Sequence, residues 1–332
     1  MIKLLMFDLK KSEEEYLREI DTSDFEITCF KNSLDKETKL TVKQCDETGI
    51  ISVFVNSKLT SEVLNKFKNL RIIVTRSVCF EHIDINECRR RNIAVINVNE
   101  YAREAISQYV IGLIFAMSRN IVLANNDVKN RINSFEKYES ENINKLSLGV
   151  IGTGSVGSAV CELAHKLGMK IYANDFIKNK NISDYTEYLS INDVLRKSDI
   201  ITLHLPYDKE LYKMISKKEF EIMKEGSFLI NTCDYRLVDI PALYKAVKNN
   251  KLKGAALDII IDNDDIFSNK KSKKSYEDLE NYLILNRLIQ SDRVIITPQI
   301  AYDTRECLTG ILDSNFRDIK DYYVGRKTNR VV

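Results

Sequence analysis

Strand-like and helix-like segments alternate along almost the whole chain, and this alternation constrains the fold more than any other feature. Short apolar runs recur, and amphipathic segments of helical period separate them. Such alternation builds a parallel sheet with helices on both of its faces. Because 332 residues exceed the usual size of a single core, two such layers are expected. The sequence therefore predicts the α/β class, with two doubly wound parallel-sheet domains of the Rossmann or flavodoxin-like kind.

The alternation occurs in two series. The first occupies residues 1–98, and a long helix over 103–130 follows it. The second series starts with a strand at 149–152 and ends with a strand at 254–260. A predicted helix over 304–323 would return to pack on the first domain, which is then discontinuous in sequence.

Charge and cysteine content exclude several classes of protein. The 50 Lys and Arg residues nearly balance the 48 Asp and Glu residues, so the net charge of +2 predicts neither nucleic acid nor an anionic membrane as a partner. The most apolar helix, YVIGLIFAM at 109–117, is far shorter than the roughly 20 residues that span a bilayer. The seven cysteines are scattered without metal-ligand spacing, which indicates reduced thiols in a cytoplasmic protein and no metal site.

A glycine-rich loop, G-T-G-S-V-G at 152–157, lies between a predicted strand and a predicted helix. Small residues let the backbone approach a pyrophosphate, and the first N–H groups of the helix can then bind it. Asp175 ends the next predicted strand, 18 residues beyond Gly157, close to where an acid binds the ribose hydroxyls of a dinucleotide. Together these features predict a dinucleotide site.

Asp175 also predicts which dinucleotide binds. A carboxylate at this position would repel the additional 2'-phosphate of NADP, and no Arg follows it directly in DFIKNK. NAD is therefore the expected cofactor. Lys178 and Lys180 are near enough to leave NADP open as the alternative.

Seven motifs follow one another over nearly the whole chain: TRSVCFEHIDI at 75–85, NVNEYAREAIS at 97–107, VIGTGSVG at 150–157, ITLHLP at 201–206, FLINT with LVD at 228–239, KGAALD at 253–258 and VIITPQIAY at 294–302. In these motifs the sequence resembles the D-isomer-specific 2-hydroxyacid dehydrogenase family. The resemblance is strongest to its D-lactate dehydrogenase branch, which includes the vancomycin-resistance type.

The resemblance implies a particular organisation. Residues 1–100 plus 299–332 would form a discontinuous substrate domain, residues 101–298 would form the NAD-binding domain, and a cleft would separate the two. A small molecule would be the substrate. A homodimer would be built around the helix that starts near Arg103.

Family positions of the cofactor site can be carried over residue by residue. The expected cofactor residues are Gly152, Gly154, Ser155, Val156 and Gly157 at the pyrophosphate, Asp175 at the adenosine ribose, Leu205 and Pro206 at the adenine-side wall, and Thr232, Cys233, Asp234 and Asp258 near the nicotinamide.

Members of this family transfer hydride with an Arg, a Glu and a His, and this chain replaces all three. The Arg of N-T-A/G-R-G, which binds the substrate carboxylate, is Asp234 here. The Glu three residues after the Asp of G-A-A-L-D is Ile261, and the His of T-P-H-x-A, which protonates the developing alkoxide, is Gln299. Tyr101 and Tyr302 match family positions at the substrate cleft, where a phenol could donate a hydrogen bond.

Other residues are candidate replacements for the missing triad. No His follows residue 204, so no shift of the last motif can supply the missing proton donor. His82 and His165 are expected to be structural, whereas His204 ends a strand near the cofactor and is a candidate acid. Arg236 would point the same way as Asp234 if the backbone stayed extended. Asp262, beside Ile261, could stand in for the missing Glu.

The substitutions have a physical consequence for ordinary 2-oxo acids. A substrate carboxylate about 4 Å from Asp234 would be repelled by roughly 4 kcal/mol at an effective dielectric constant near 20. The Gln299 amide can polarise a carbonyl group but cannot transfer a proton, and the loss of a positioned acid costs on the order of 10²- to 10⁴-fold in rate. Slow reduction of 2-oxo acids is expected.

Three functional hypotheses follow. The chain is an NAD-dependent oxidoreductase whose substrate carries a cation or a hydroxyl group opposite Asp234, as in imine or amine chemistry. Alternatively, it is a non-catalytic NAD(H)-binding sensor or scaffold. In the third hypothesis it reduces 2-oxo acids weakly, through Arg236 and a tyrosine.

Overall fold

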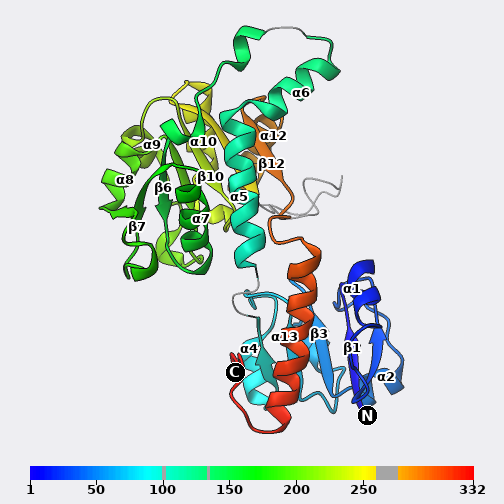
Figure 1. The fold of residues 1–332 in the computed structure, drawn as a ribbon. Helices are drawn as coiled ribbons and strands as arrows, with labels where there is room; N and C mark the ends of the chain where they lie inside the picture. The colour runs from blue at the N-terminus through cyan, green and yellow to red at the C-terminus, as the bar shows by residue number, and fades with distance from the viewer. Residues whose placement is uncertain (99–101, 133–134, 259–275) are drawn as a thin grey trace. The chain divides into compact units, whose positions relative to one another are not determined.

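The computed structural model describes residues 1–98, 102–132, 135–258 and 276–332. The chain divides into two compact units, Met1–Tyr101 with Asp303–Val332 and Ala102–Tyr302. Each unit contains one sheet of parallel strands with helices packed on it, which confirms the predicted α/β class (Figure 1).

The first unit is built on a five-stranded sheet. Its strand order is β2-β1-β3-β4-β5, and all of its strand pairs are parallel. The strands are β1 (Ile2–Met6), β2 (Phe25–Cys29), β3 (Ile50–Val53), β4 (Ile72–Thr75) and β5 (Ala94–Ile96). The helices are α1 (Lys11–Tyr16), α2 (Val42–Glu47), α3 (Ser61–Leu64), α4 (Ile85–Arg90) and α13 (Arg305–Tyr323).

Both faces of this sheet are buried. Successive side chains of a strand point to opposite faces, so Leu4 of β1 joins one apolar cluster and Leu5 joins the other. The Leu5 cluster includes residues of α3 and α4, whereas the Leu4 cluster includes Leu312 and Phe316 of α13. The last helix in the sequence therefore completes the core of the first unit, as predicted (Figure 1).

The second unit is built on a seven-stranded parallel sheet of order β12-β11-β10-β9-β6-β7-β8. The strands are β6 (Ser147–Ile151), β7 (Lys170–Asn174), β8 (Thr186–Tyr188), β9 (Ile200–Leu203), β10 (Ser227–Asn231), β11 (Leu252–Asp258) and β12 (Val294–Thr297). The helices are α5 (Arg103–Ser118), α6 (Ile121–Lys129), α7 (Ser155–Lys166), α8 (Ile191–Lys197), α9 (Lys217–Ile222), α10 (Ile240–Lys248) and α12 (Tyr276–Ile289).

Two helical layers cover this second sheet. Apolar side chains of α5 and α7 pack on one face with Phe228 and Ile230 of β10. Side chains of α8, α9, α10 and α12 pack on the other face with Leu229. Because both faces are buried, the strands are almost continuously apolar, as is typical of parallel sheets.

The single helix predicted over 103–130 is wrong, because it is broken into α5 and α6. Asn120 lies between them and adopts a left-handed conformation with φ of 52°. Asparagine tolerates this conformation better than most residues, so the break needs neither Gly nor Pro.

No single helix in the described part of the chain is long and apolar enough to span a membrane. Only α5 and α6 taken together reach that length and hydropathy, and they are bent by 59°.

Candidate active site

The glycine-rich loop joins β6 to α7, and packing requires two of its glycines. Gly152 has φ of +91°, and a Cβ there would lie 2.3 Å from the carbonyl oxygen of His204. A Cβ on Gly157 would lie 1.9 Å from the carbonyl oxygen of Gly152. By contrast, a Cβ built on Gly154 would meet no heavy atom of the described chain within 4 Å, apart from atoms of the residues adjacent in sequence. The loop is therefore tightly packed at its ends and open at Gly154.

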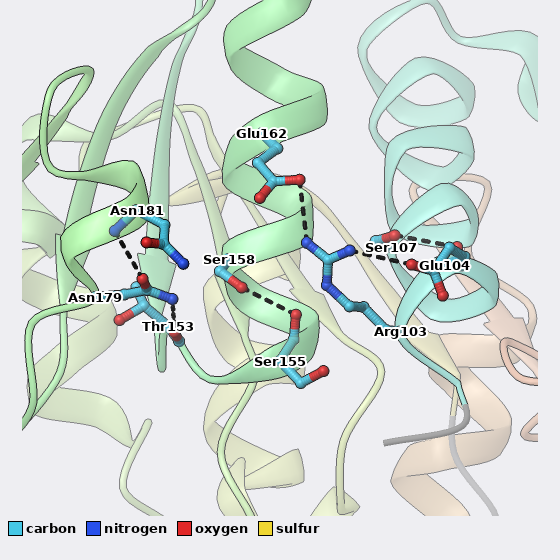
Figure 2. Close-up of polar contacts among 9 residues, drawn as sticks. All are labelled: Arg103, Glu104, Ser107, Thr153, Ser155, Ser158, Glu162, Asn179 and Asn181. Carbon is cyan, nitrogen blue, oxygen red and sulfur yellow. Dashed lines mark hydrogen bonds and ion pairs between the residues drawn. The ribbon is translucent and has the colours of Figure 1, made fainter.

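The helix that follows the loop is suited to bind an anion. α7 begins at Ser155, and its N-cap Gly154 has no side chain to satisfy the first N–H groups. These groups have no partner within a helix, and the helix dipole adds to their attraction for a phosphate. The Ser158 hydroxyl donates back to the Ser155 carbonyl oxygen at 3.0 Å (Figure 2). The open loop and the free N–H groups of Ser155 and Val156 fit the pyrophosphate of NAD.

Asp175 follows β7 and faces the glycine-rich loop. Its Oδ2 accepts hydrogen bonds from the Thr153 N–H at 2.5 Å and from Thr153 Oγ1 at 3.1 Å, and its Oδ1 accepts from the Ile177 N–H at 3.1 Å. Partial burial acts to raise the pKa of Asp175, but these hydrogen bonds outweigh it and lower the pKa below its ordinary value. A carboxylate has about four lone-pair positions, so Asp175 can still accept a hydrogen bond from a ribose hydroxyl.

A polar network not predicted from the sequence supports this loop. Thr153 Oγ1 accepts a hydrogen bond from the Tyr188 hydroxyl at 2.9 Å. Figure 2 shows Asn179 Nδ2, which donates to the Thr153 carbonyl oxygen at 3.4 Å, and the Asn181 N–H, which donates to Asn179 Oδ1 at 3.0 Å. Thr153 lies within the recognised motif, whereas no motif includes Tyr188.

Two apolar side chains next to Asp175 are almost wholly exposed. Phe176 is fully exposed and Ile177 is 82% exposed. The ring of Phe176 is thus one residue away from the carboxylate expected to bind the adenosine ribose. Such a ring is available to stack on a base.

Arg103, where the predicted dimer helix starts, ties α5 to α7. Its Nη2 contacts Glu162 of α7 at 3.0 Å, and its Nη1 contacts Glu104 at 3.0 Å (Figure 2). The Ser107 hydroxyl donates to the Glu104 carbonyl oxygen at 3.0 Å. The first turn of α5 is therefore fixed beside the helix that follows the glycine-rich loop.

The end of β9 forms a wall beside the loop. Leu205 Cδ2 would lie 2.9 Å from a Cβ on Gly152, and Pro206 next to it is exposed. His204 is half-buried with its Nδ1 shielded from solvent, and desolvation lowers the pKa of its imidazole to about 3. Its Nε2 lies 3.0 Å from Thr202 Oγ1, while its Nδ1 has no partner in the described chain. An imidazole that stays neutral at physiological pH is a poor proton donor, so the structure argues against His204 as the replacement acid.

The residues after β10 form a compact turn. The Asn231 side chain accepts from the Cys233 N–H at 2.9 Å and donates to the Asp234 carbonyl oxygen at 3.0 Å. The Cys233 thiol donates to the Leu203 carbonyl oxygen at 3.1 Å, and burial raises its pKa to about 12, so the thiol stays protonated at neutral pH. Thr232 Oγ1 is buried without a partner in the described chain, which leaves a polar atom available next to the expected nicotinamide position.

Asp234 is not an isolated negative charge. Arg236 Nε donates to its Oδ1 at 2.8 Å, and Arg236 Nη2 donates to its Oδ2 at 2.6 Å. The guanidinium also lies 3.6 Å from the centre of the Tyr207 ring. The hydrogen bond and charge of Asp234 raise the pKa of Arg236. The expected repulsion of a substrate carboxylate counted Asp234 alone, and it must be corrected for this neutralising partner.

The backbone explains why Arg236 reaches Asp234. Residues Tyr235–Leu237 form a 3₁₀ turn rather than an extended segment, and the Arg236 N–H donates to Asp234 Oδ1 at 2.8 Å. The side chain two residues on therefore folds back over its own turn. It does not project in parallel with Asp234, as an extended backbone would require.

Asp258 is 1% exposed and holds the loop that carries Gln299. Its Oδ1 accepts hydrogen bonds from Thr297 Oγ1 at 2.5 Å and from the Ile300 N–H at 2.9 Å, and its Oδ2 accepts from the Ala301 N–H at 2.7 Å. Gln299 itself is exposed and has φ of 53°, in the left-handed region. Asp258 therefore fixes the conformation of the segment 297–301.

Four other residues predicted for the substrate site remain to be placed. Tyr101, Ile261 and Asp262 lie outside the described residues. Tyr302 is half-buried at the end of the second unit.

The two remaining histidines have structural surroundings. His82 lies in the first unit with Nε2 3.2 Å from Thr75 Oγ1, and burial lowers its pKa. His165 stacks on Tyr185 with ring centres 4.1 Å apart. No group of three or more His, Cys, Asp or Glu side chains in the described chain could hold a metal ion.

Comparison with known families gives one clear match. Residues 111–301 match the model of the NAD-binding domain of D-isomer-specific 2-hydroxyacid dehydrogenases. An aromatic 2-oxoacid reductase of Clostridium sporogenes is 31% identical over 275 residues, which cover 82% of each chain. D-lactate dehydrogenase of Escherichia coli is 27% identical, and the match covers 98% of each chain.

Solved structures show the same likeness over the whole chain. D-lactate dehydrogenase of Aquifex aeolicus, complexed with NAD and lactic acid, has a TM-score of 0.81 at 30% identity and covers 97% of this chain and 96% of its own. The apo form of the Escherichia coli D-lactate dehydrogenase has a TM-score of 0.85 at 25% identity and covers both chains completely.

Proposed function

Because this chain belongs to the D-isomer-specific 2-hydroxyacid dehydrogenase family, we propose that it is an NAD-dependent oxidoreductase that transfers hydride between NAD(H) and a small CH–OH or C=O substrate. The observation that carries the proposal is the glycine-rich loop, open at Gly154, together with the ionised Asp175 held beside it. NAD, when bound, supplies or accepts the hydride. The chain supplies the pyrophosphate and ribose contacts and orients the substrate.

Preference for NAD over NADP is part of the proposal. Asp175 keeps its negative charge at neutral pH because its pKa is lowered, so it would repel the 2'-phosphate of NADP. Lys178 lies 5.8 Å from the centre of the Tyr188 ring. We therefore expect NADH to bind more tightly than NADPH, with Lys178 and Lys180 able to reduce the difference.

The two units are proposed to bind different ligands, one the substrate and the other NAD. Residues 1–100 plus 299–332 would form the substrate domain, and residues 101–298 would form the NAD-binding domain. A homodimer built around the helix that starts at Arg103 is proposed from the family resemblance. A cytoplasmic location is proposed because the seven cysteines are free thiols.

Catalysis is proposed to be slow with ordinary 2-oxo acids. No His follows residue 204 in the sequence, and His204 itself is held neutral by burial. Gln299 can donate an amide hydrogen bond to a carbonyl oxygen but cannot protonate it, so a rate on the order of 10²- to 10⁴-fold below that of a chain with the acid is expected. Tyr302 and Tyr101 are the phenols proposed to assist.

The same absence of an acid favours a second candidate function, an NAD(H)-binding sensor or scaffold without turnover. The two functions share the cofactor site and differ only in chemistry. A cationic or imine substrate opposite Asp234 is disfavoured, since Arg236 already neutralises that carboxylate.

One experiment separates these possibilities. NADH binding is measured by fluorescence titration, and NADH consumption is then followed with 2-oxo acids, amines and imines. A variant carrying Asp234→Arg, Ile261→Glu and Gln299→His serves as the matched control, because it restores the three family residues. Gain of 2-oxo acid reduction by this variant would support the residue assignments, and failure of the parent to bind NADH would refute the proposed function.

A further inference from the structure

We propose that the hollow between the α5–α6 junction and the amino ends of β10, β11 and β12 is a second ligand site of this chain. It would take a small organic anion whose apolar body is about the size of one ring. The inference does not rest on the proposed function, because none of the residues that line this hollow is expected to contact NAD or its substrate.

The break between α5 and α6 forms one wall of the hollow. The two helices are bent by 59° around Asn120, which itself lines the hollow together with Met117 of α5 and Leu123 of α6 (Figure 1). Gly254 of β11 allows the end of α5 to pack this closely, since a Cβ there would lie 3.1 Å from Met117 Cε and 2.3 Å from the Arg293 carbonyl oxygen. The bend thus leaves an apolar space between the helix junction and the sheet.

The size of the space limits the ligand. Phe228 of β10 and Ile295 of β12 form the wall opposite the helices, and the volume enclosed is about 170 Å³. A cavity of about 150 Å³ is enough to hold benzene, whereas sites for larger organic ligands occupy about 300–1,000 Å³. One ring or a short branched chain therefore fits, and a nucleotide does not.

The charged residues of the hollow favour an anion. Lys137, Lys253 and Arg293 line it, and Asp292 is the only acidic residue among its lining residues in the described chain. Like charges gathered around an apolar wall attract an ion of the opposite sign. An apolar molecule that carries one carboxylate would meet both the walls and this excess of positive charge.

Lys253 is the cation best placed to bind such a carboxylate. Lys137 already lies 3.4 Å from Asp127, and Arg293 Nη1 donates to Asn250 Oδ1 at 2.6 Å. Lys253 makes no ion pair within the described ranges of the chain, and its Nζ lies 5.7 Å from the centre of the Phe228 ring. Its ammonium group can therefore bind an anion whose apolar body lies in the hollow.

The hollow is separate from the expected NAD site. Phe228 lies near the amino end of β10, whereas Thr232 follows its carboxyl end. Four residues of strand span about 13 Å at about 3.3 Å per residue. Dinucleotides bind outside the carboxyl ends of such strands, so a ligand in the hollow and NADH should bind independently.

The test uses benzoate as the probe, with its uncharged analogue benzyl alcohol beside it. Binding to the full chain is measured by titration calorimetry, with and without NADH, in the parent, Lys253→Gln and Lys253→Arg. Lys251→Gln is the matched control, because it removes the same charge two residues away from a side chain that does not line the hollow. We expect Lys253→Gln to weaken benzoate about 5- to 10-fold, Lys253→Arg to weaken it less than about twofold, and Lys251→Gln to leave it unchanged.

A second measurement locates the probe. In protein labelled with ¹³C at the methionine methyl groups, the Met117 resonance is identified by its loss in Met117→Leu. This resonance should shift when benzoate binds, because the ring would lie beside the Met117 methyl group. Benzyl alcohol should bind at least about fivefold more weakly than benzoate and should not respond to Lys253→Gln.

Several outcomes would overturn the inference. They are absence of benzoate binding, equal binding of benzoate and benzyl alcohol, equal benzoate affinity in the parent and Lys253→Gln, an unmoved Met117 resonance, and competition between benzoate and NADH. A chain that binds benzoate at Met117 but does not bind NADH would refute the proposed function and leave this inference standing.

Discussion

The desolvated imidazole of His204, whose Nδ1 is shielded from solvent, links folding stability to pH. Its folded-state pKa of about 3 lies below the ordinary value of 6.5, so between these values the unfolded chain binds a proton that the folded chain does not. Stability from this residue is complete above pH 6.5 and is lost as the pH falls toward 3, by about 1.4 kcal/mol per pH unit. Urea unfolding between pH 4.5 and 7 should therefore show a smaller slope of stability against pH in His204→Gln.

The matched control is His165→Gln, which removes a stacked imidazole from α7. Its slope should equal that of the parent. Identical slopes for the parent and His204→Gln would mean that the imidazole of His204 titrates as it does in the unfolded chain.

The exposed ring of Phe176 should contribute to cofactor affinity. It follows the ribose-binding carboxylate directly, and base–aromatic stacking is worth about 1 kcal/mol or more, or about fivefold in affinity. Phe176→Ala should weaken AMP and NADH by about this factor and leave nicotinamide mononucleotide unaffected, whereas Phe176→Tyr should bind all three normally. Equal losses for AMP and nicotinamide mononucleotide in a titration would contradict the assignment.

At the scale of a residue, the identity of Asp234 at the family's Arg position was predictable from the sequence, but its ion pair was not. The substitution of Arg by Asp could be recognised from the motif, because the flanking residues align without a gap. The pairing with Arg236 could not, because it depends on a 3₁₀ turn where an extended segment was assumed. The local charge thus depends on the turn over Tyr235–Leu237, which brings Arg236 onto Asp234, as well as on residue type.

At the scale of an element, two glycines of the glycine-rich loop have different roles: Gly157 is required by packing, and Gly154 is expected to be required by NAD binding. Gly157→Ala should lower the melting temperature, because its Cβ would overlap the Gly152 carbonyl oxygen at 1.9 Å. Gly154→Ala should leave the melting temperature within about 2 °C, because the space beside Gly154 is open. The same Gly154 variant should bind NADH about tenfold more weakly, as judged by fluorescence titration, since its methyl group would enter the pyrophosphate position.

The two variants act as controls for each other. A Gly154→Ala protein that binds NADH normally would show that no phosphate approaches this residue. A Gly157→Ala protein with unchanged melting temperature would contradict the described contact.

Most elements were predictable because their signals are local. The strand before the glycine-rich loop, the helix after it and the parallel direction of the strands follow from apolar runs and their alternation. The division of the helix after Arg103 was missed, because Asn120 adopts a left-handed conformation that residue type alone does not require. Burial of Asp258 was also missed, since its three hydrogen bonds come from a segment about 40 residues later.

At the scale of the whole molecule, the cofactor should stabilise the two units unequally. All the proposed contacts with the pyrophosphate and the adenosine ribose lie within Ala102–Tyr302. At about 100 times the dissociation constant, NADH should stabilise this unit by about 2.7 kcal/mol. Amide hydrogen exchange with and without NADH should show increased protection in β6, β7 and α7, and little change in β1–β5; equal protection in both units would contradict the proposed division of work.

The return of α13 to the first unit has a consequence during synthesis. Leu4, Ile50 and Ile72 pack against Leu312 and Phe316, which the ribosome adds about 240 residues or more later. At 5–20 residues per second this delay is roughly 10–50 s. For that interval one face of the nascent first sheet lacks its covering helix, and its apolar side chains stay accessible to solvent until α13 is made.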